Sequence, residues 1–499
     1  MSAPTLSRSP GGAEAPARTP GPLGRRVGVR RLERSGLLLV ALAAVLGFLL
    51  FPTYPNYDSM YSLLWGRELL DLERPTFDAY RAPTQHPLAI ILGAGLSLLG
   101  GAAERTFVAL CVVSFVVLVV GLYQLGKTAF TPLVGAVAAG LLVTRFDFPF
   151  LAARGYIDPA YLALVVWAAV LELRRPRRGT AVLVLLALAG LLRPEGWVLA
   201  GLYFLWVAWR APWRVRARWA LLAGAAPVLW ALVDLAVTGD PLFSLHGTSE
   251  LAAELGRNKG AGAVPTALWS FLVKLAKLPV VLGGVAGAGL ALLLMPSRLR
   301  MPLVLFGAGV GTFALVGAAG LSVIDRYLLV PSLMVMVLCG VAVGGWTMLR
   351  EGLLLRRLWA GGAIALVLFG LVFTALRVDP ARLTTELTFR GDAHEALVAA
   401  LDDPAVAEGL RCGAFHTPNH KLVPDVRWRL GLPEDRVLAR SSAGVGEPRS
   451  GVVLLVHQRS AIFRQSLVTA ADEPGDSVPP PGFERRAVTR YYSVYVGCP

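Results

Sequence analysis

The sequence predicts an all-α polytopic membrane domain of about eleven transmembrane helices and one short half-helix, followed by a C-terminal extracytoplasmic α/β domain. Hydrophobic residues make up 55% of the 499 residues and charged residues only 16%, with a mean hydropathy of +0.60. This balance is typical of helical membrane proteins. The arginines gather in short clusters between apolar runs, as the positive-inside rule produces. After residue 376 the charge rises and the apolar runs shorten.

The formal net charge of +15 does not indicate nucleic-acid binding. The arginines form no continuous basic face of the kind that nucleic acids require. Anionic lipid head groups are a sufficient partner for clusters that flank membrane spans. We therefore expect membrane lipids, and no nucleic acid, as partners of these residues.

Residues 1–34 are rich in Pro, Gly, Ser, Ala and Arg and show no apolar periodicity. This composition predicts a disordered cytoplasmic tail. The arginines that close the tail hold this end of the chain inside: Arg25, Arg26, Arg30, Arg31 and Arg34. The apolar run that follows lacks an A-x-A-like exit and leads into further spans, which favours an uncleaved anchor over a signal peptide.

The membrane domain is expected over residues 35–376, and its topology depends on residues 86–101. This run supplies about 15 apolar residues, fewer than the roughly 20 that cross a bilayer. If it crossed, the basic loops would change sides and conflict with the tail. As a half-helix that enters and returns, it leaves every basic loop cytoplasmic. The expected spans are then 36–52, 106–125, 130–145, 157–173, 179–193, 196–209, 218–237, 270–294, 301–321, 327–348 and 357–376.

The remaining residues, 377–499, are expected to form an extracytoplasmic α/β domain of about 120 residues, enough for a core of its own. Strand-like runs cover 452–457 and 491–497, and 393–401 reads as a helix. Cys412 and Cys498 lie in this domain, where an oxidising compartment permits a disulfide. Pairing of neighbouring strands could bring them together.

The sequence contains no cysteine pair with metal-ligand spacing and no nucleotide-binding glycine loop. Cys111 and Cys339 lie in spans, where a free cysteine acts as a small apolar residue. The glycines are scattered through the spans, where they let helices approach closely. No cofactor is expected, although Asp58 and Asp158 carry oxygen ligands that could bridge a divalent ion.

Ionisable residues gather in the predicted outer loops, where their rarity in such a chain makes them functional candidates. The first outer loop carries Asp58 in N-Y-D-S-M-Y, and His86 before a proline. The others contribute a set of both signs: Arg145, Asp147, Arg154, Asp158, Arg193, Glu195, Asp240, His246, Glu250, Arg257, Lys259, Asp325, Arg326 and Tyr327.

Several of these segments resemble the GT-C superfamily of membrane glycosyltransferases, which take sugars from polyprenyl-phosphate carriers. The resemblance covers roughly residues 36–376 as weak motifs in the right order. The segments are N-Y-D-S-M-Y-S-L-L-W-G-R-E-L-L, P-T-Q-H-P-L, R-G-Y-I-D-P-A-Y-L, R-P-E-G-W and D-R-Y-L-L-V-P. Within this superfamily, the chain resembles the aminoarabinose and protein O-mannosyl transferases and the RgtA/B/C/D-like group. It has H-P-L where many relatives have a doubled proline.

The chemistry of sugar transfer from a lipid phosphate requires these residue types. A carboxylate takes the proton of the acceptor hydroxyl as it attacks C1 of the donor, and cations stabilise the charge that grows on the leaving phosphate. The resemblance implies that Asp58 is the base, that Asp158 orients donor or acceptor, and that Arg326 with Tyr327 binds the carrier phosphate. We expect the remaining donor- or acceptor-binding residues to be His86, Arg154, Arg193, Glu195 and Lys259.

Structural roles are open for the same residues. Asp58 could cap a helix over 59–72, and Asp158, followed by Pro159, could cap its span. Arg326 could pair with Asp325 or anchor a lipid head group, and Arg193 could pair only with Glu195 across a tight hairpin.

The expected function is therefore a glycosyltransferase in a bacterial plasma membrane, acting on an extracytoplasmic glycan, lipid or protein acceptor. A transporter or flippase is the main alternative, but it predicts charges at the bilayer midplane and an internal repeat. The candidate residues lie at span ends on one side instead. A polysaccharide ligase or polymerase that uses lipid-linked glycans is a nearer alternative. The aminoarabinose and mannosyl relatives suggest that no metal is required.

Overall fold

The computed structural model describes residues 22–254, 260–465 and 478–498. By their internal contacts, residues Met1–Leu46 and Gly47–Pro499 form two units. The first unit contains most of α1 (Pro22–Leu50), a helix whose start lies within the predicted tail. The apolar part of α1 is long enough to cross a membrane. All of the elements described below belong to the second unit.

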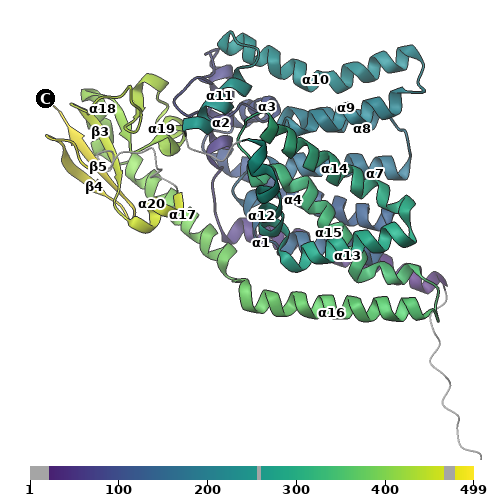
Figure 1. Cartoon of the computed structure of the whole chain (residues 1–499). Helices are drawn as coiled ribbons and strands as arrows, with labels where there is room; N and C mark the ends of the chain where they lie inside the picture. The colour runs from purple at the N-terminus through teal and green to yellow at the C-terminus, as the bar shows by residue number, and fades with distance from the viewer. Residues whose placement is uncertain (1–21, 255–259, 466–477, 499) are drawn as a thin grey trace, which may run out of the picture. The chain divides into compact units, whose positions relative to one another are not determined.

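The membrane part of this unit is built from helices (Figure 1). Six described helices of the chain are long and apolar enough to cross a membrane, or up to eight if each bent pair is one span. The chain is thus a multi-pass membrane protein, although the expected count of eleven spans is not confirmed. The α-helices are α2 (Tyr57–Leu70), α3 (Pro87–Ser97), α4 (Ala103–Ala129), α5 (Pro132–Thr144), α6 (Asp147–Ala153), α7 (Asp158–Arg174), α8 (Thr180–Leu192), α9 (Glu195–Ala208), α10 (Trp213–Thr238), α11 (Phe243–Glu254), α12 (Val264–Ala276), α13 (Leu278–Leu294), α14 (Pro296–Ala318), α15 (Leu329–Gly344) and α16 (Leu354–Arg377). Short 3-10 helices are η1 (Gly100–Ala102), η2 (Ala261–Ala263), η3 (Asp325–Leu328) and η4 (Gly345–Met348).

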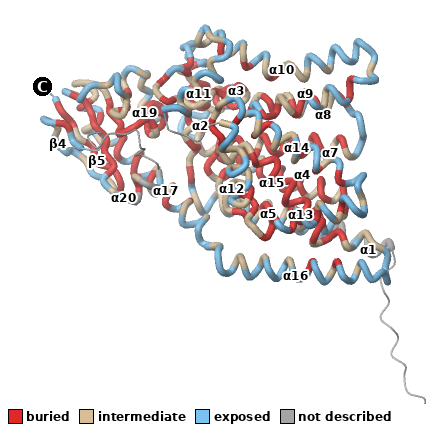
Figure 2. Tube along the Cα trace, viewed as in Figure 1, coloured by how far each residue is buried: buried red, intermediate tan, exposed pale blue. Residues whose placement is uncertain are grey.

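Burial differs sharply between these helices. Helix α15 is buried along nearly its whole length, whereas α16 exposes most of its apolar residues (Figure 2). An apolar helix exposed to water would be costly, so this surface is suited to lipid. Helix α15 therefore forms the core of the bundle, and α16 is suited to its lipid-facing surface.

The span predicted over 270–294 is not one continuous helix. It consists of α12 and α13, which meet at an angle of 105°. Lys277 makes the bend and has a φ of +74°, a conformation that is uncommon for a residue with a side chain. Pro279 then lies in the first turn of α13, where a proline needs no hydrogen-bond donor. A second bend, of 62°, separates α5 from α6.

Helix α3 has the short length that the expected half-helix requires. Its 11 residues rise roughly 16 Å, about half of the ~30 Å hydrocarbon core. It packs closely against α2: a Cβ added at Gly93 would lie 2.2 Å from the carbonyl oxygen of Ser62, and one at Gly66 would lie 2.2 Å from the amide nitrogen of Ala94. Glycines on both helices therefore let α3 support the helix that begins beside Asp58.

The C-terminal part of the second unit is a small α/β sheet domain, as predicted. The sheet order is β2-β1-β3-β5-β4. Strand β1 runs parallel to β2 and β3, while β5 runs antiparallel to β3 and β4. The strands are β1 (Phe415–Thr417), β2 (Val437–Ala439), β3 (Gly451–Val456), β4 (Glu484–Val488) and β5 (Tyr492–Gly497). The helices are α17 (Arg382–Leu401), α18 (Pro404–Cys412), η5 (His420–Leu422), α19 (Val423–Leu430), η6 (Glu434–Arg436) and α20 (Arg459–Gln465).

The disulfide between Cys412 and Cys498 is present, with Cα atoms 5.4 Å apart. Cys412 ends helix α18 rather than lying in a strand, so the bond joins a helix to the residue after β5. Two paired strands, as expected from the sequence, are thus not the geometry that forms it. The bond closes the last strand onto the domain.

The sheet domain is attached to α2 by buried polar contacts. Arg427 of α19 donates from Nη2 to Glu68 Oε1 at 2.7 Å and from Nη1 to Thr76 Oγ1 at 2.9 Å. Both members of the Arg427–Glu68 pair have side chains that are at most 5% exposed. Arg67 donates in return to the carbonyl oxygen of Trp428 at 2.9 Å. Since buried pairs tolerate little displacement, these contacts fix the helix that carries Asp58.

Candidate functional site

Asp58 lies in the first turn of α2 and does not cap it. The cap is Asn56, whose Oδ1 accepts a hydrogen bond from the amide of Ser59 at 3.1 Å. The capping role considered for Asp58 is therefore taken by another residue. The amide of Asn56 donates to the carbonyl oxygen of Arg154 at 2.8 Å, and Ser59 Oγ donates to that of Gly155 at 2.6 Å. These bonds hold the segment before Asp58 beside the segment before Asp158.

Asp158 is the first residue of α7 and is fully buried. Its Oδ1 accepts a hydrogen bond from Arg193 Nη1 at 2.5 Å. Arg193 lies in the short link between α8 and α9, where the tight hairpin was predicted. It also donates to Glu195 Oε1 from Nε at 3.1 Å and from Nη2 at 2.9 Å. The expected Arg193–Glu195 pair therefore exists, and Asp158 extends it.

Arg326 completes the arrangement from η3. Its Nη1 and Nη2 donate to Asp58 Oδ2 at 3.2 and 3.3 Å, and Nη1 lies 3.7 Å from Asp158 Oδ2. Its neighbour Asp325 pairs with Lys274 instead, at 2.5 Å. The guanidinium of Arg326 thus lies between Asp58 and Asp158, the two residues that the sequence analysis considered as ligands of a divalent ion.

These contacts form an alternating charge chain, which we define as Asp58, Arg326, Asp158, Arg193 and Glu195. Its buried end is closed, because the side chains of Asp158, Arg193 and Glu195 are 0%, 7% and 10% exposed. Its other end is open, with Asp58 and Arg326 25% and 31% exposed. The pair that was assigned to acid–base and phosphate chemistry is therefore the pair that a substrate can reach.

The electrostatics of the open end suit a base. Burial by itself would raise the pKa of Asp58, but the positive charge of Arg326, assisted by that of Lys421, holds that pKa below its ordinary value. For a group that is positively charged when protonated, burial has the opposite effect, and it lowers the pKa of His86 to about 4. At neutral pH Asp58 is accordingly ionised and His86 is neutral.

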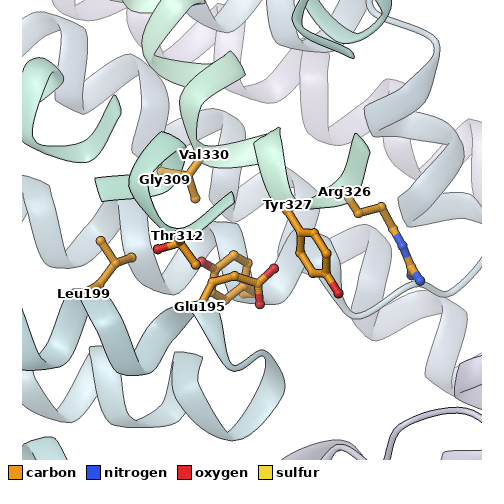
Figure 3. Close-up of a pocket in the computed structure, with 8 residues that line it drawn as sticks. Glu195, Leu199, Gly309, Thr312, Arg326, Tyr327 and Val330 are labelled. Atoms are coloured by element: carbon orange, nitrogen blue, oxygen red, sulfur yellow. The ribbon is translucent and has the colours of Figure 1, made fainter. Parts of the chain in front are cut away.

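A small pocket adjoins the charge chain (Figure 3). Arg326, Tyr327 and Glu195 line it on the polar side. Its other lining residues come from α7, α9, α14 and α15: Tyr161, Leu199, Gly309, Thr312 and Val330. An arginine beside apolar walls is the combination of groups that suits a phosphate joined to a hydrocarbon chain.

Aromatic rings enclose the two arginines. The guanidinium of Arg193 lies 5.8 Å from the ring centroid of Tyr327 and 5.9 Å from that of Tyr161. That of Arg326 lies 5.5 Å from the ring of Tyr156. These contacts hold the guanidiniums in a partly water-free environment. Tyr156 and Tyr161 were not singled out from the sequence, although both lie in the R-G-Y-I-D-P-A-Y segment that pointed to Asp158.

The other expected site residues fall in different places. His86 lies before α3, where its ring meets the Trp230 ring edge-on at 5.8 Å, and the charge of Asp58 partly offsets the effect of burial on the pKa of His86. Arg154 stands outside the charge chain: it donates to the carbonyl oxygen of Tyr54 at 3.0 Å and stacks on that ring at 4.0 Å. Lys259 lies outside the described residues.

Two residues of the sheet domain contact Tyr57, the neighbour of Asp58 at the open end of the charge chain. Lys421 Nζ lies 4.7 Å from the ring centroid of Tyr57, and His420 meets the same ring edge-on at 5.6 Å. No sequence signal pointed to these residues, because their approach depends on how the sheet domain docks. Among the described residues, no group of three or more His, Cys, Asp and Glu side chains is placed to hold a metal ion.

No protein-family model matches the sequence, and no curated protein matches it. The structure is similar to ArnT from Cupriavidus metallidurans bound to undecaprenyl phosphate, with a TM-score of 0.55 at 13% identity, over 92% of this chain and 98% of ArnT. ArnT in the apo state gives a TM-score of 0.54 at 14% identity, over 93% and 98%. The Archaeoglobus fulgidus oligosaccharyltransferase tethered to an acceptor peptide with the NVT sequon gives 0.52 at 13%, over 92% of this chain and 73% of that protein.

At these low sequence identities, the similarity establishes the fold alone. ArnT and the oligosaccharyltransferase are both GT-C superfamily membrane glycosyltransferases. The resemblance stated from the order of the sequence motifs is confirmed at this level: the chain has the GT-C fold.

Proposed function

We propose that this chain is an integral membrane glycosyltransferase that moves a sugar from a polyprenyl-phosphate donor to an extracytoplasmic acceptor. The observation that carries the proposal is the open end of the charge chain, where Asp58 and Arg326 lie in contact beside an apolar pocket. The fold supports it, since a neighbour with the same fold is ArnT bound to undecaprenyl phosphate. A bacterial plasma membrane, with the site on its outer face, is the location we propose.

The proposed reaction assigns one task to each end of the Asp58–Arg326 pair. Asp58 takes the proton of the acceptor hydroxyl while its oxygen attacks C1 of the donor sugar. The bond from C1 to the phosphate oxygen breaks, and polyprenyl phosphate leaves with the bonding electrons. Arg326 stabilises the charge that this oxygen gains, which a guanidinium does with two parallel hydrogen bonds.

The buried half of the charge chain keeps Arg326 in position. Asp158 attracts the guanidinium of Arg326 from the buried side. Asp158 is itself held by a hydrogen bond from Arg193, which also donates to Glu195. Arg326 therefore needs little rearrangement during the reaction, which is the condition for effective electrostatic stabilisation. The pocket beside Tyr327 is the proposed place for the first part of the lipid chain. Neither task requires a metal or another cofactor.

The experiment incubates the purified full chain with a panel of polyprenyl-phosphate sugars and measures release of polyprenyl phosphate. We expect one or more donors to be consumed, and Asp58→Asn to reduce turnover by a factor on the order of 10²–10⁴ while donor binding survives. The matched control is Asp78→Asn, which removes an exposed carboxylate of the first predicted outer loop that pairs with Arg74 rather than with a member of the charge chain. Normal turnover by Asp58→Asn would refute the base.

A further inference from the structure

A second group of charges lies near the bend between α12 and α13, and its least satisfied member is Arg145. This residue follows α5 and is only 8% exposed. Its Nε is buried and has no hydrogen-bond partner in the described part of the chain. The charge of Asp147 acts on Arg145, but among those residues no carboxylate forms an ion pair with its guanidinium. Removing a guanidinium from water without a counter-ion is costly, so this position calls for an anion.

Other cations gather around Arg145 from separate elements. Lys277 forms the bend, with Nζ donating to the carbonyl oxygen of Lys274 at 2.7 Å. Arg382, at the start of α17, stacks on the ring of Phe146 at 4.2 Å. The charges of Arg145, Arg382 and Lys274 all act on Lys277, as does that of Asp147. We define the outer basic cluster as Arg145, Asp147, Lys274, Lys277, Asp325 and Arg382.

The outer basic cluster has an excess of positive charge. It contains four cations and two carboxylates among the described residues, and one carboxylate, Asp325, is already engaged by Lys274. The predicted topology places Arg145, Asp147, Asp325 and Arg382 on the outer side, and Lys274 and Lys277 near the outer end of the span expected over 270–294. The positive-inside rule disfavours lysine and arginine on that side. Lys277 also keeps a positive φ at the bend, a strain that persists in proteins chiefly at functional positions.

We propose that the outer basic cluster binds the phosphate group of a membrane lipid, at a site separate from Arg326. A phosphate mono- or diester carries the charge that the cluster leaves uncompensated, and arginine binds it with parallel hydrogen bonds. Next to the cluster, α12 exposes Trp269 to 55%, a residue type that favours the membrane interface. Both an anionic phospholipid and the polyprenyl-phosphate carrier present this group. The site does not depend on the proposed glycosyl transfer.

The test measures lipid binding to the delipidated full chain in detergent by native mass spectrometry. The probes are phosphatidylglycerol, undecaprenyl phosphate and, as a soluble source of the same group, inorganic phosphate. We expect Arg145→Met to weaken binding of at least one lipid about tenfold. The matched control is Arg74→Gln, which removes a positive charge from another outer loop where Arg74 is 60% exposed. We expect this control to stay within about twofold of the wild type.

Because Arg145 is buried without an ion pair in the described part of the chain, Arg145→Met should keep or raise the melting temperature, so lost binding will not reflect unfolding. Lys277→Gln is a second variant on the same site. Loss confined to phosphatidylglycerol assigns the site to phospholipid. If undecaprenyl phosphate binds at two sites, Arg326→Gln should remove the first bound molecule. Loss of only the second bound molecule in Arg145→Met then assigns the outer basic cluster to the carrier lipid. Unchanged affinity of Arg145→Met for both lipids overturns the proposal, and so does binding of inorganic phosphate alone.

Discussion

Asp158 is the residue that organises the site, although it is the acid that no substrate can reach. One of its oxygens is held by Arg193, and the other faces Arg326 at 3.7 Å without a hydrogen bond of its own. A buried carboxylate with one unsatisfied oxygen attracts the nearest guanidinium without bonding it fully. Arg326 is thus positioned by Asp158 and retains donor groups for Asp58 and for an incoming phosphate.

The first prediction concerns the geometry of Arg326. Arg326→Lys keeps the charge but loses the planar fork that can bind two oxygens at once. We expect undecaprenyl phosphate to bind about tenfold more weakly, and turnover of an identified donor to fall further because the phosphate charge grows in the transition state. Native mass spectrometry and release of polyprenyl phosphate are the two measurements. A change confined to the affinity for the acceptor would show that Arg326 does not bind the phosphate.

A second prediction concerns Asp425, a buried residue of α19 in the sheet domain. Burial raises its pKa to about 7, an effect that the charge of Glu104 adds to and those of His394 and Arg154 oppose. Because the folded state holds this proton more tightly than the unfolded state, stability falls as the pH rises from about 4 to 7. Asp425→Asn removes that loss.

We expect the melting temperature of Asp425→Asn to exceed that of the wild type by a few degrees at pH 8, and the difference to shrink towards pH 4. Thermal unfolding in detergent across this pH range is the measurement. Asp402→Asn serves as a control, because Asp402 is an exposed carboxylate of the same domain that pairs with Arg429. A difference that is equal at both pH values would mean that Asp425 is not protonated in the folded protein.

Candidate site residues could be predicted from the sequence where they belong to a motif. Their interaction partners could not be predicted, because these depend on tertiary contacts. Asp58, Asp158 and Arg326 were selected from separate motifs, and the fold brings them together. The partner of Arg326 could not be predicted, since Asp325 was nearer in sequence than Asp58. Lys421 was missed because its position beside Tyr57 is set by the docking of the sheet domain.

At the scale of elements, hydropathy located apolar segments but not their bends. The window 270–294 is mostly apolar, with Lys274 and Lys277 near its start, so a single helix was expected. The available signal was Lys277-Leu278-Pro279, in which a proline marks a helix start. Length was more informative for α3. The apolar run there is too short to cross a bilayer, which predicted a short helix such as α3.

The third prediction tests the packing of α13 against α15. A Cβ added at Gly287 would lie 1.9 Å from the carbonyl oxygen of Leu338, so Gly287→Ala must force the two helices apart. We expect a loss of roughly 1–3 kcal/mol in unfolding free energy, the usual effect of overpacking. Gly289→Ala is the matched control, since a Cβ there meets nothing within 4 Å. Melting temperatures that fall equally in both variants would assign the effect to the helix backbone rather than to the contact.

At the scale of the whole chain, the change in composition after residue 376 correctly indicated a sheet domain. The strands expected over 452–457 and 491–497 correspond to β3 and β5, and the helix expected over 393–401 is part of α17. The short strands β1 and β2 were not predicted, because three residues carry no alternating pattern. The attachment of the domain through Arg427 and Glu68 was not predicted either: Glu68 lies in the motif that contains Asp58, but Arg427 belongs to no motif, so nothing in the sequence paired the two residues.

The final prediction is the topology. The 11-residue length of α3 opposes a crossing, and without that crossing the basic loop 174–178 lies in the cytoplasm while Asp58, Asp158 and Arg326 lie on the outer face. The Cys412–Cys498 disulfide supports the same side for the sheet domain, because such bonds persist in oxidising compartments. We expect a cysteine placed at Pro176 to resist a membrane-impermeant maleimide in intact cells and to react after the membrane is opened.

The control for this scan is Glu73→Cys, an exposed position in the loop between α2 and α3 that should react from outside. Cys111 and Cys339 are buried and should stay silent in both variants. Labelling of the residue-176 cysteine in intact cells, at the rate of the residue-73 cysteine, would place the basic loops outside. The half-helix would then have to be a span, and an outward-facing site would contradict the charge distribution that predicted it.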